Sequence, residues 1–206
     1  MMDISKEYKK EEVLEYQIDL NNDPNRRAMT SKRELRRIED IVHIKHLKRN
    51  AKKILCIGAR DDSEIQTFID AGYEAKGIDI CRETNLITKM DMADLTTKFG
   101  TFDIAYCSHV LEHVIDPLKV FKAIKRVTKK AIFIILPIVN RQPDIEHPTV
   151  YEVMKHQPSK NFIRYPQAWD DFHSLMPWKI KYCCYRNALT EDYEVAFILE
   201  LGGWIN

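Results

Sequence analysis

Two residues near the ends of predicted strands have the types and spacing of a nucleoside-binding site. Gly58 closes the apolar stretch KILCIG, and Asp79 lies near the end of AKGIDI, 21 residues further along the chain. In a doubly wound sheet, a carboxylate about 20 residues after a glycine turn accepts hydrogen bonds from a ribose. The pair therefore predicts a bound nucleoside. The simpler alternative is that Asp79 is a solvated loop acid.

The loop after Gly58 indicates which kind of nucleoside would bind. Its pattern is Gly58-x-Arg60-x-x-Ser63, and Asp61 and Asp62 occupy the positions that a pyrophosphate would approach. Each carboxylate would repel a pyrophosphate by about 1 kcal/mol or more, even in a high dielectric. S-adenosylmethionine has no phosphate; it carries a sulfonium cation and an amino-acid end, which an acidic loop tolerates. We expect carbonyl oxygens of the Gly58 turn to receive its ammonium group and Arg60 to meet its carboxylate.

Two histidines and a glutamate follow the stretch FDIAYCS. The segment HVLEH, residues 109–113, fits the H-x-x-E-H pattern of inverted zinc peptidases, in which two histidines on one helix face reach a metal. No further ligand is identifiable and Pro117 begins a new helix just after, so we predict no metal site. His109 is better placed as a general base, which methyl transfer needs only when the acceptor has a proton to lose. Pocket lining without catalysis is the alternative role for His109 and for the other candidate bases, His113, His147 and His173.

The elements that must position these residues alternate between strand and helix. Apolar, strand-sized runs at 53–58, 75–80, 85–90, 102–108 and 131–136 are separated by predicted helices at 62–71 and 117–129. Strands that are apolar on both faces and separated by helices predict a parallel sheet covered on both sides. Two alternating strands at 178–188 and 193–201 then form a hairpin, which we expect to add an antiparallel edge.

A basic helix precedes this body. Residues 26–53 hold eleven Lys and Arg against three Asp and Glu, whereas residues 61–116 hold four against twelve. Ser31 and Glu34 form a capping box, and an apolar stripe follows. We expect the body to cover this stripe and the cations to face outward, so that the arm is a packing helix. Contact with nucleic acid through this arm is the less favoured alternative. The predicted stripe is Leu35, Ile38, Ile41/Val42 and Leu47.

Composition sets the remaining limits. A chain of 206 residues with a net charge of +1 fits one domain of ordinary size. The N-terminal segment is charged throughout, without the apolar core of a signal peptide, and no apolar run is long enough to span a bilayer. The five cysteines show no C-x-x-C pair and no framework spacing. We therefore expect a reduced, cytoplasmic protein without a membrane partner.

The motif series resembles that of class I S-adenosylmethionine-dependent methyltransferases, particularly the type-11 group. The resemblance rests on ILCIGARDD, GIDI, DMADL, FDIAYCSHVLEHVIDP and AIFIILP, which span roughly residues 54–137, and on the final hairpin. It implies a Rossmann-like, doubly wound, mostly parallel seven-strand sheet whose last strand is antiparallel. It also implies a methionine site at Gly58 and Ala59, a ribose acid at Asp79 with Ile80 beside the adenine, an adenine-facing acid at Asp91 with Met92 next to it, and pocket-lining residues Cys107, Ser108 and His109.

The sequence departs from the family pattern in the first motif. One of the usual three glycines remains, and Cys56 replaces the acid two residues before it. The loop is therefore either a variant that still binds or a degenerate one that has lost the cofactor. Glu64, at the start of the following helix, either supports a variant loop or is an ordinary acid at a helix N-terminus.

The resulting hypothesis assigns an N-terminal helical arm to residues 1–50 and a methyltransferase domain to residues 51–206. Within that domain, residues 139–178 form an aromatic and proline-rich insertion on the acceptor side. The predicted function is S-adenosylmethionine-dependent methyl transfer to a small or medium-sized acceptor. The alternative is a non-catalytic cofactor-binding or interaction protein, and a dehydrogenase comes third. The aromatic residues of the insertion are Tyr151, Phe162, Tyr165, Trp169 and Trp178.

Overall fold

The structure is a computed structural model, and it describes most of the central part of the chain. The described residues are 12, 15–16, 18–19, 30–114, 116–138, 152–153, 163–164, 179–187 and 193–200. Several predictions fall outside them: the candidate bases His147 and His173, and the five aromatic residues of the insertion.

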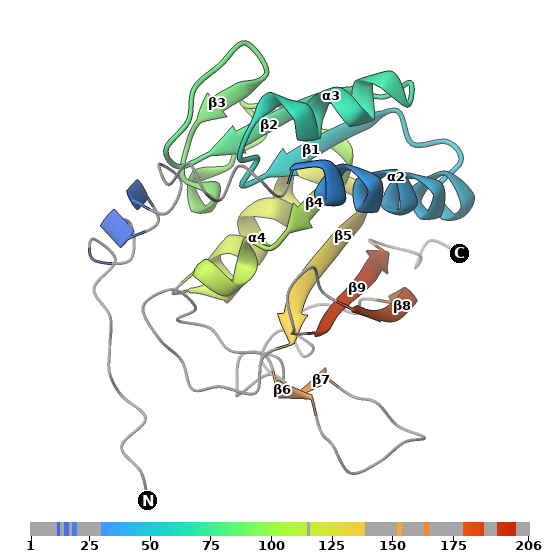
Figure 1. The fold of residues 1–206 in the computed structure, drawn as a ribbon. Coiled ribbons are helices and arrows are strands. Elements are labelled where there is room, and N and C mark those ends of the chain that lie inside the picture. The colour runs from blue at the N-terminus through green and yellow to red at the C-terminus, as the bar shows by residue number, and fades with distance from the viewer. Residues whose placement is uncertain are drawn as a thin grey trace, which may run out of the picture.

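Seven strands form one sheet, in the order β3-β2-β1-β4-β5-β9-β8 (Figure 1). The five strands β1 to β5 are mutually parallel. β1, β4 and β5 are mostly apolar runs that are buried on both faces, as predicted, whereas β2 and β3 carry exposed polar residues. The strands are β1 (Lys53–Ile57), β2 (Glu74–Asp79), β3 (Ile87–Lys89), β4 (Phe102–Ser108), β5 (Thr128–Ile138), β8 (Lys179–Asn187) and β9 (Tyr193–Glu200).

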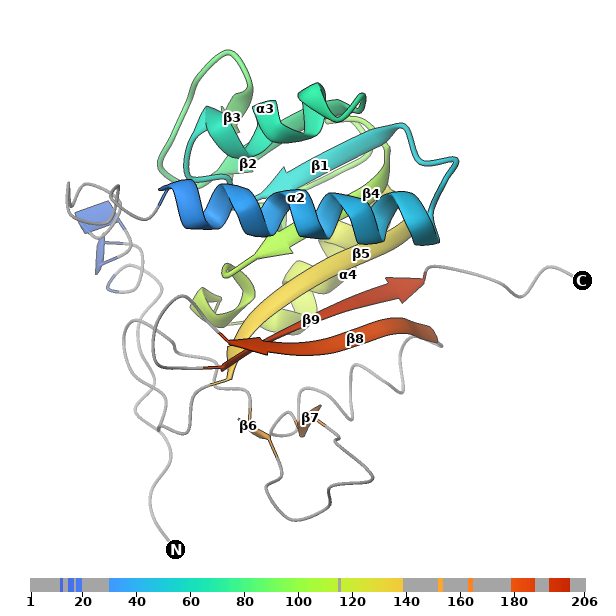
Figure 2. The same ribbon diagram turned by 45° about the vertical axis from the view of Figure 1, so that its right-hand side comes forward.

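Helices cover both faces of the sheet, which gives three layers (Figure 2). On one face α2 (Thr30–Leu47) and α3 (Asp62–Asp70) pack against alternate residues of β1, β4 and β5, and on the other face α4 (Pro117–Val127) does so. α4 begins at Pro117, as predicted, and Asp116 caps it: Asp116 Oδ1 accepts a 2.9 Å hydrogen bond from Lys119 N. Short 3₁₀ turns, η2 (Met92–Asp94) and η3 (Leu111–His113), follow β3 and β4.

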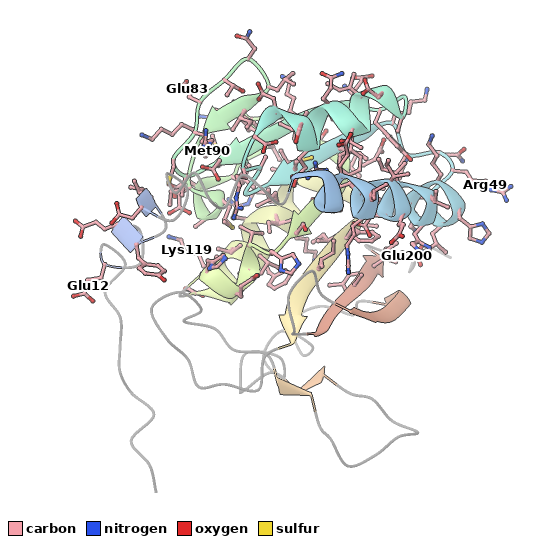
Figure 3. All side chains as sticks on the ribbon, in the orientation of Figure 1. Glu12, Arg49, Glu83, Met90, Lys119 and Glu200 are labelled. Carbon is pink, nitrogen blue, oxygen red and sulfur yellow. The ribbon has the colours of Figure 1, made fainter. Side chains whose placement is uncertain are left out.

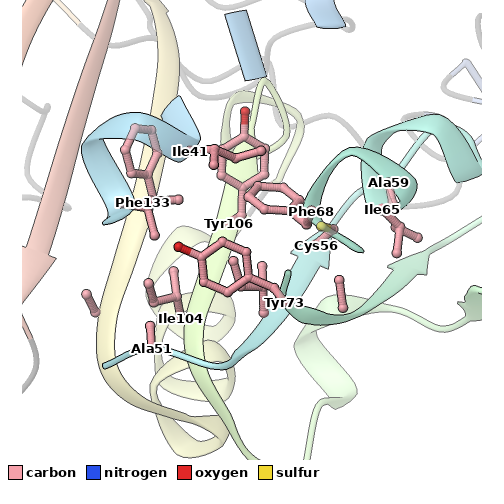
Figure 4. Packing of buried hydrophobic residues seen from close by; sticks show 14 of the residues in the cluster. Ile41, Ala51, Cys56, Ala59, Ile65, Phe68, Tyr73, Ile104, Tyr106 and Phe133 are labelled. Carbon is pink, nitrogen blue, oxygen red and sulfur yellow. The ribbon is translucent and has the colours of Figure 1, made fainter. Parts of the chain in front are cut away.

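The aromatic centre of the α2–α3 layer is Tyr106. Its ring lies 5.0 Å from Phe68 of α3 and 5.6 Å from Phe133 of β5, measured between ring centroids (Figure 4). Its hydroxyl donates a 2.7 Å hydrogen bond to Asp40 Oδ2 of α2, and both residues are buried. This buried hydrogen bond holds α2 against β4 and gives each of the two polar groups a partner.

The C-terminal hairpin confirms the antiparallel last strand and corrects its position. β9 pairs antiparallel with β5 on one side and with β8 on the other. The antiparallel strand is therefore inside the sheet, and β8 forms the edge, parallel to the first five strands. Burial explains the order: Ala196, Ile198 and Leu199 of β9 are buried.

The apolar stripe predicted for α2 is wrong in part. Ile41 is buried and Leu47 is partly buried against the core, whereas Leu35, Ile38 and Val42 are 64%, 48% and 60% exposed. Ile44, which is not part of the predicted stripe, is also buried. The helix is rotated away from the expected face because two polar residues, Arg37 and Asp40, also face the body and have partners there.

The expectation that all cations of α2 face outward is also wrong. Arg37 is 7% exposed, and Lys48, just after the helix, forms an ion pair with Glu200 of β9. These two cations therefore face the body and have partners there. Among the described residues, no helix has the length and apolarity that crossing a membrane requires.

A second, two-stranded sheet consists of β6 (Glu152–Val153) and β7 (Ile163–Arg164), which pair antiparallel. Both ribbon views draw it beyond the carboxyl end of β5. These four residues are the described part of the predicted insertion.

Candidate cofactor site

The predicted site residues gather at the carboxyl ends of β1, β2 and β4. β1 lies between β2 and β4, so the chain leaves β1 toward one side of the sheet and later returns to the other side. Open α/β sheets bind ligands in the crevice outside such a switch point. The turns that follow these three strands hold the residues that we predicted for the methionine part of the cofactor, for its ribose and for the side from which the acceptor would approach.

Gly58 shapes the turn that follows β1. Its φ is 68°, a left-handed conformation that glycine adopts without strain, and its N–H donates to Ile78 O at 2.9 Å. A Cβ atom built on Gly58 would lie 2.4 Å from Val110 Cγ2. Both the conformation and the space therefore require glycine. Ala59 is fully buried, so only its backbone can contact a ligand.

Asp61 and Asp62 are used within the fold. Asp61 is the N-cap of α3, and its Oδ1 accepts a 2.9 Å hydrogen bond from Ser63 N and a further bond from Ser63 Oγ. Burial alone would raise the pKa of Asp61, but the bonds from Ser63 outweigh it and lower that pKa. Asp62 Oδ1 accepts from Thr84 Oγ1 at 2.5 Å. The acidic loop thus keeps its negative charge while it caps one helix and ties down the β2–β3 connection.

Asp79 ends β2 and is 7% exposed. Its Oδ1 accepts hydrogen bonds from Cys81 N at 2.7 Å and from Arg82 N at 3.0 Å. These bonds use one carboxylate oxygen and hold the side chain in place. The second oxygen is not engaged by them, so the group can accept from a hydroxyl of a ligand. Ile80, next to it, is partly buried.

Asp91 and Met92 follow β3. Asp91 is the N-cap of η2, with its Oδ1 accepting a 2.9 Å hydrogen bond from Ala93 N. Met92 is partly buried against the core on the α4 side of the sheet. The cap explains why an acid stands here, and a role in adenine binding stays a prediction.

The turn after β4 holds the histidine predicted as a base. His109 has a φ of 51°, and among the described residues it alone combines a side chain with a positive φ. Its N–H donates to Ile135 O at 3.0 Å, and its Nδ1 lies 3.5 Å from Glu112 Oε1. Ser108, at the end of β4, is partly buried and hydrogen-bonds to the Tyr106 hydroxyl.

Glu112 is a buried acid at the centre of this turn. It is 2% exposed, and its Oε1 lies 4.0 Å from His113 Nε2 in addition to its contact with His109. Burial acts to raise the pKa of Glu112, but the hydrogen bond from His109 and the charges of His113 and His109 outweigh it and lower that pKa. Glu112 therefore stays ionised and orients the two histidines.

The geometry assumed for a zinc site is not present. His109 precedes η3, and η3 is a single 3₁₀ turn, so the two histidines do not lie four residues apart on one α-helix. In the described part of the chain, no group of three or more His, Cys, Asp or Glu side chains is arranged to hold a metal ion.

Two charged residues join the site from the helices. Arg37 of α2 donates through Nη2 to Ser63 Oγ at 3.2 Å, beside the Gly58 loop. Glu64, in the first turn of α3, hydrogen-bonds to the Cys56 thiol of β1. The sequence analysis did not identify Arg37 as a site residue, because its helix lies before the motif series. The only sign in the sequence was a cation next to apolar positions of a helix. Arg60, which we expected to meet a carboxylate, is partly buried in the loop.

A separate hollow lies at the amino ends of the strands, opposite the candidate site. Lys53, Tyr73, Glu74 and Phe102 line it, at the amino ends of β1, β2 and β4. A 3.1 Å ion pair between Lys53 and Glu74 spans part of its rim, and the predicted nucleoside residues are all at the other edge. We place the candidate site at the carboxyl ends because the glycine turn and the positioned acid Asp79 are there.

Comparisons with known proteins agree with this architecture. A family model described as "Methyltransferase domain" matches residues 27–185. A ubiquinone biosynthesis O-methyltransferase of Paraburkholderia phymatum is 26% identical over 111 residues, which are 47% of this chain and 48% of that protein. The chain thus matches about half the length of this curated relative.

Solved structures share the fold at low sequence identity. A 1,6-didemethyltoxoflavin-N1-methyltransferase of Burkholderia thailandensis superposes with a TM-score of 0.68 at 11% identity, over 98% of this chain and 94% of that one. A magnesium protoporphyrin IX methyltransferase of Synechocystis gives 0.59 at 11% identity, over 87% and 88%. The PH0226 protein of Pyrococcus horikoshii gives 0.57 at 16% identity, over 88% and 93%.

Proposed function

Because the chain belongs to the methyltransferase-domain family, we propose that it transfers a methyl group from S-adenosylmethionine to a small or medium-sized acceptor. One observation carries the placement of the site. Gly58 N donates to Ile78 O, so the glycine turn lies directly beside the residue that precedes Asp79. A nucleoside with an amino-acid end fits this juxtaposition, because its two parts need the two adjacent turns.

The residues that would hold the cofactor lie at four turns. The Gly58 turn, with the backbone of Ala59 and the side chain of Arg60, receives the methionine part. Asp79 accepts from the ribose hydroxyls through the oxygen that its backbone bonds leave available, beside Ile80. Asp91 and Met92 take the adenine, and Ser108 lines the pocket where the sulfonium would lie. The bound cofactor would supply an electrophilic methyl carbon, and the chain's main contribution would be alignment of the acceptor with it.

His109 is the proposed general base where the acceptor carries a proton. Its contact with ionised Glu112 holds the ring in place. His109→Asn is the suitable variant, because asparagine tolerates a left-handed φ better than most residues. We expect this variant to keep cofactor affinity and lose about 100-fold or more in the rate of transfer. Equal rates would remove His109 from the chemistry.

The acceptor is proposed to enter from the side of residues 139–178. Its class is supported by the relatives, whose names describe methyl transfer in ubiquinone biosynthesis and onto a toxoflavin precursor. Acceptors of such enzymes are organic molecules of small or medium size. We also propose a cytoplasmic location, since that is where S-adenosylmethionine chemistry with reduced cysteines would take place.

Calorimetric titration with S-adenosylhomocysteine tests the proposal, with NAD⁺ as the competing ligand. We expect saturable binding of the adenosyl ligand and none of NAD⁺, because the acidic loop repels a pyrophosphate. Binding of NAD⁺ alone would make the protein a dehydrogenase candidate. No heat with either ligand, at protein concentrations that would detect a micromolar site, would favour the non-catalytic interaction protein.

A further inference from the structure

Arg37 is a buried cation with spare hydrogen-bonding capacity beside the Gly58 loop. It is 7% exposed, and its Nη2 donates to the neutral hydroxyl of Ser63. Its Nε is buried without an acceptor among the described residues. Buried polar groups are almost always satisfied. The charge of Arg37 helps to lower the pKa of Asp61, so one carboxylate lies nearby, but the Nε donor is left for a further acceptor. Arg37 therefore has the features of a residue whose acceptor comes from a ligand.

Glu64 lies in the first turn of α3, directly after Ser63, the residue that Arg37 contacts. It hydrogen-bonds to the thiol of Cys56, the residue that replaces the usual acid of the first motif. After burial, the charge of Glu64 is the largest cause that raises the pKa of Cys56, and it also raises that of Cys107. Cys56 lies on β1 beside Phe68 of α3 (Figure 4), and Cys107 lies on β4. The Glu64 carboxylate thus lies near Cys56 of β1.

We propose that Arg37 and Glu64 bind the amino-acid end of the cofactor, Arg37 its carboxylate and Glu64 its ammonium group. The inference rests on the proposed function and changes the expected partner of the carboxylate from Arg60 to Arg37. The pair is complementary to a zwitterion, because it offers a cation from α2 and an anion from α3 beside the loop that follows Gly58. A guanidinium binds a carboxylate through two parallel N–H bonds, and Nε is one of the donors in that geometry.

This pair also explains how a loop with one glycine could bind the ligand. Side chains in place of the other glycines keep backbone N–H groups from approaching a ligand closely. Cys56 also lacks the carboxylate of the acid that usually stands at this position. Glu64 restores a carboxylate next to position 56, from the following helix. Arg37 adds a cation from α2, which makes the N-terminal helix a part of the binding site.

Two ligands separate this role from a structural one. S-adenosylhomocysteine contains the amino-acid end, and 5′-methylthioadenosine lacks it but keeps the adenosine and sulfur. Calorimetry is run on the full chain with both ligands for the parent, Arg37→Gln and Glu64→Gln. Arg49→Gln and Glu39→Gln are matched controls, since both residues lie exposed on or just after α2; Arg49 is labelled in Figure 3.

We expect Arg37→Gln and Glu64→Gln each to weaken S-adenosylhomocysteine binding by about 10- to 100-fold, as loss of a charged hydrogen bond does. Methylthioadenosine should bind to both variants as to the parent, which also shows that they are folded. The control variants should bind both ligands like the parent. Should Arg37→Gln not fold, Arg37→Lys keeps the charge and should still weaken the homocysteine ligand alone, because lysine cannot form the two-bond contact.

Unchanged binding of S-adenosylhomocysteine in both variants would overturn the inference and leave the proposed function intact. Equal weakening of both ligands would also overturn it, because the two residues would then support the pocket as a whole. A parent that binds neither ligand would refute the proposed function and this inference together.

Discussion

Replacement of Gly58 by alanine should destabilise the protein more than the same change at Gly72. Gly58 has a φ of 68° and Gly72 a φ of 93°, so both changes force a side chain into a backbone conformation that costs about 1–2 kcal/mol. At Gly72 nothing lies within 4 Å of the added Cβ, whereas at Gly58 it would lie 2.4 Å from Val110 Cγ2 and 2.9 Å from Val110 Cβ. Overpacking of this kind adds about 1–3 kcal/mol.

Urea unfolding of the two variants and the parent measures this difference. We expect a loss in free energy of unfolding of about 2–5 kcal/mol for Gly58→Ala and about 1–2 kcal/mol for Gly72→Ala. Val110→Ala removes Cγ2, the nearer of the two clashing atoms, so the double variant with Gly58→Ala should lose less than the sum of the two single changes. Equal losses at Gly58 and Gly72, or simple additivity with Val110→Ala, would refute the packing that shapes the candidate site.

Four further outcomes are expected. Asp79→Ala should weaken S-adenosylhomocysteine binding by roughly 2–3 kcal/mol and Asp79→Asn by less, and parent-like calorimetric affinity in both would mean that Asp79 does not bind the ribose. Tyr106→Phe should lose about 1–3 kcal/mol of stability, because it removes the donor to buried Asp40, and a neutral result in urea would contradict that bond's importance. Burial alone would raise the pKa of Asp103, but hydrogen bonds from Lys52 N, Lys53 N and Lys130 Nζ outweigh it and lower that pKa. Asp103 therefore stabilises the fold fully above its ordinary pKa of 3.8, and this stabilisation is lost as the pH falls through the lower pKa of the folded state. Asp103→Asn should make the free energy of unfolding depend less on pH in acid, and an unchanged dependence would contradict this. Gel shifts should show no tight, salt-sensitive binding of nucleic acid; tight binding that Lys45→Glu with Arg49→Glu abolishes would make α2 a nucleic-acid contact.

Hydrophobic periodicity and the residues typical of turns and helix caps predicted most of the sheet. The run FDIAYCS coincides with β4, and the predicted Asp116–Pro117 start of a helix coincides with that of α4. These signals are local: apolar strands bounded by glycine or by caps need no knowledge of their neighbours. The antiparallel last strand came from the family resemblance. Its place inside the sheet did not follow from the pattern, because alternation along a hairpin does not say which of its strands pairs with β5.

The orientation of α2 could not be predicted from the same kind of pattern. Apolar spacing favoured the face with Leu35 and Ile38, while the body covers the face with Arg37, Asp40 and Ile44. Buried polar residues that find partners on other elements outweigh a few apolar side chains, and those partners, Ser63 and Tyr106, are far away in sequence. The same long-range contacts bring Arg37 and Glu64 to the candidate site, where sequence spacing alone pointed to Arg60.

Hydrogen–deuterium exchange with and without S-adenosylhomocysteine tests the central claim most directly, because it reports both binding and its location. The ligand should slow amide exchange in peptides that cover residues 58–64, 79–84 and 108–113, at the carboxyl ends of β1, β2 and β4. Peptides at the opposite edge, around residues 73–76 and 99–102, should exchange at the same rate in both samples. Slowing confined to that opposite edge, or no slowing anywhere at a saturating ligand concentration, would contradict the account.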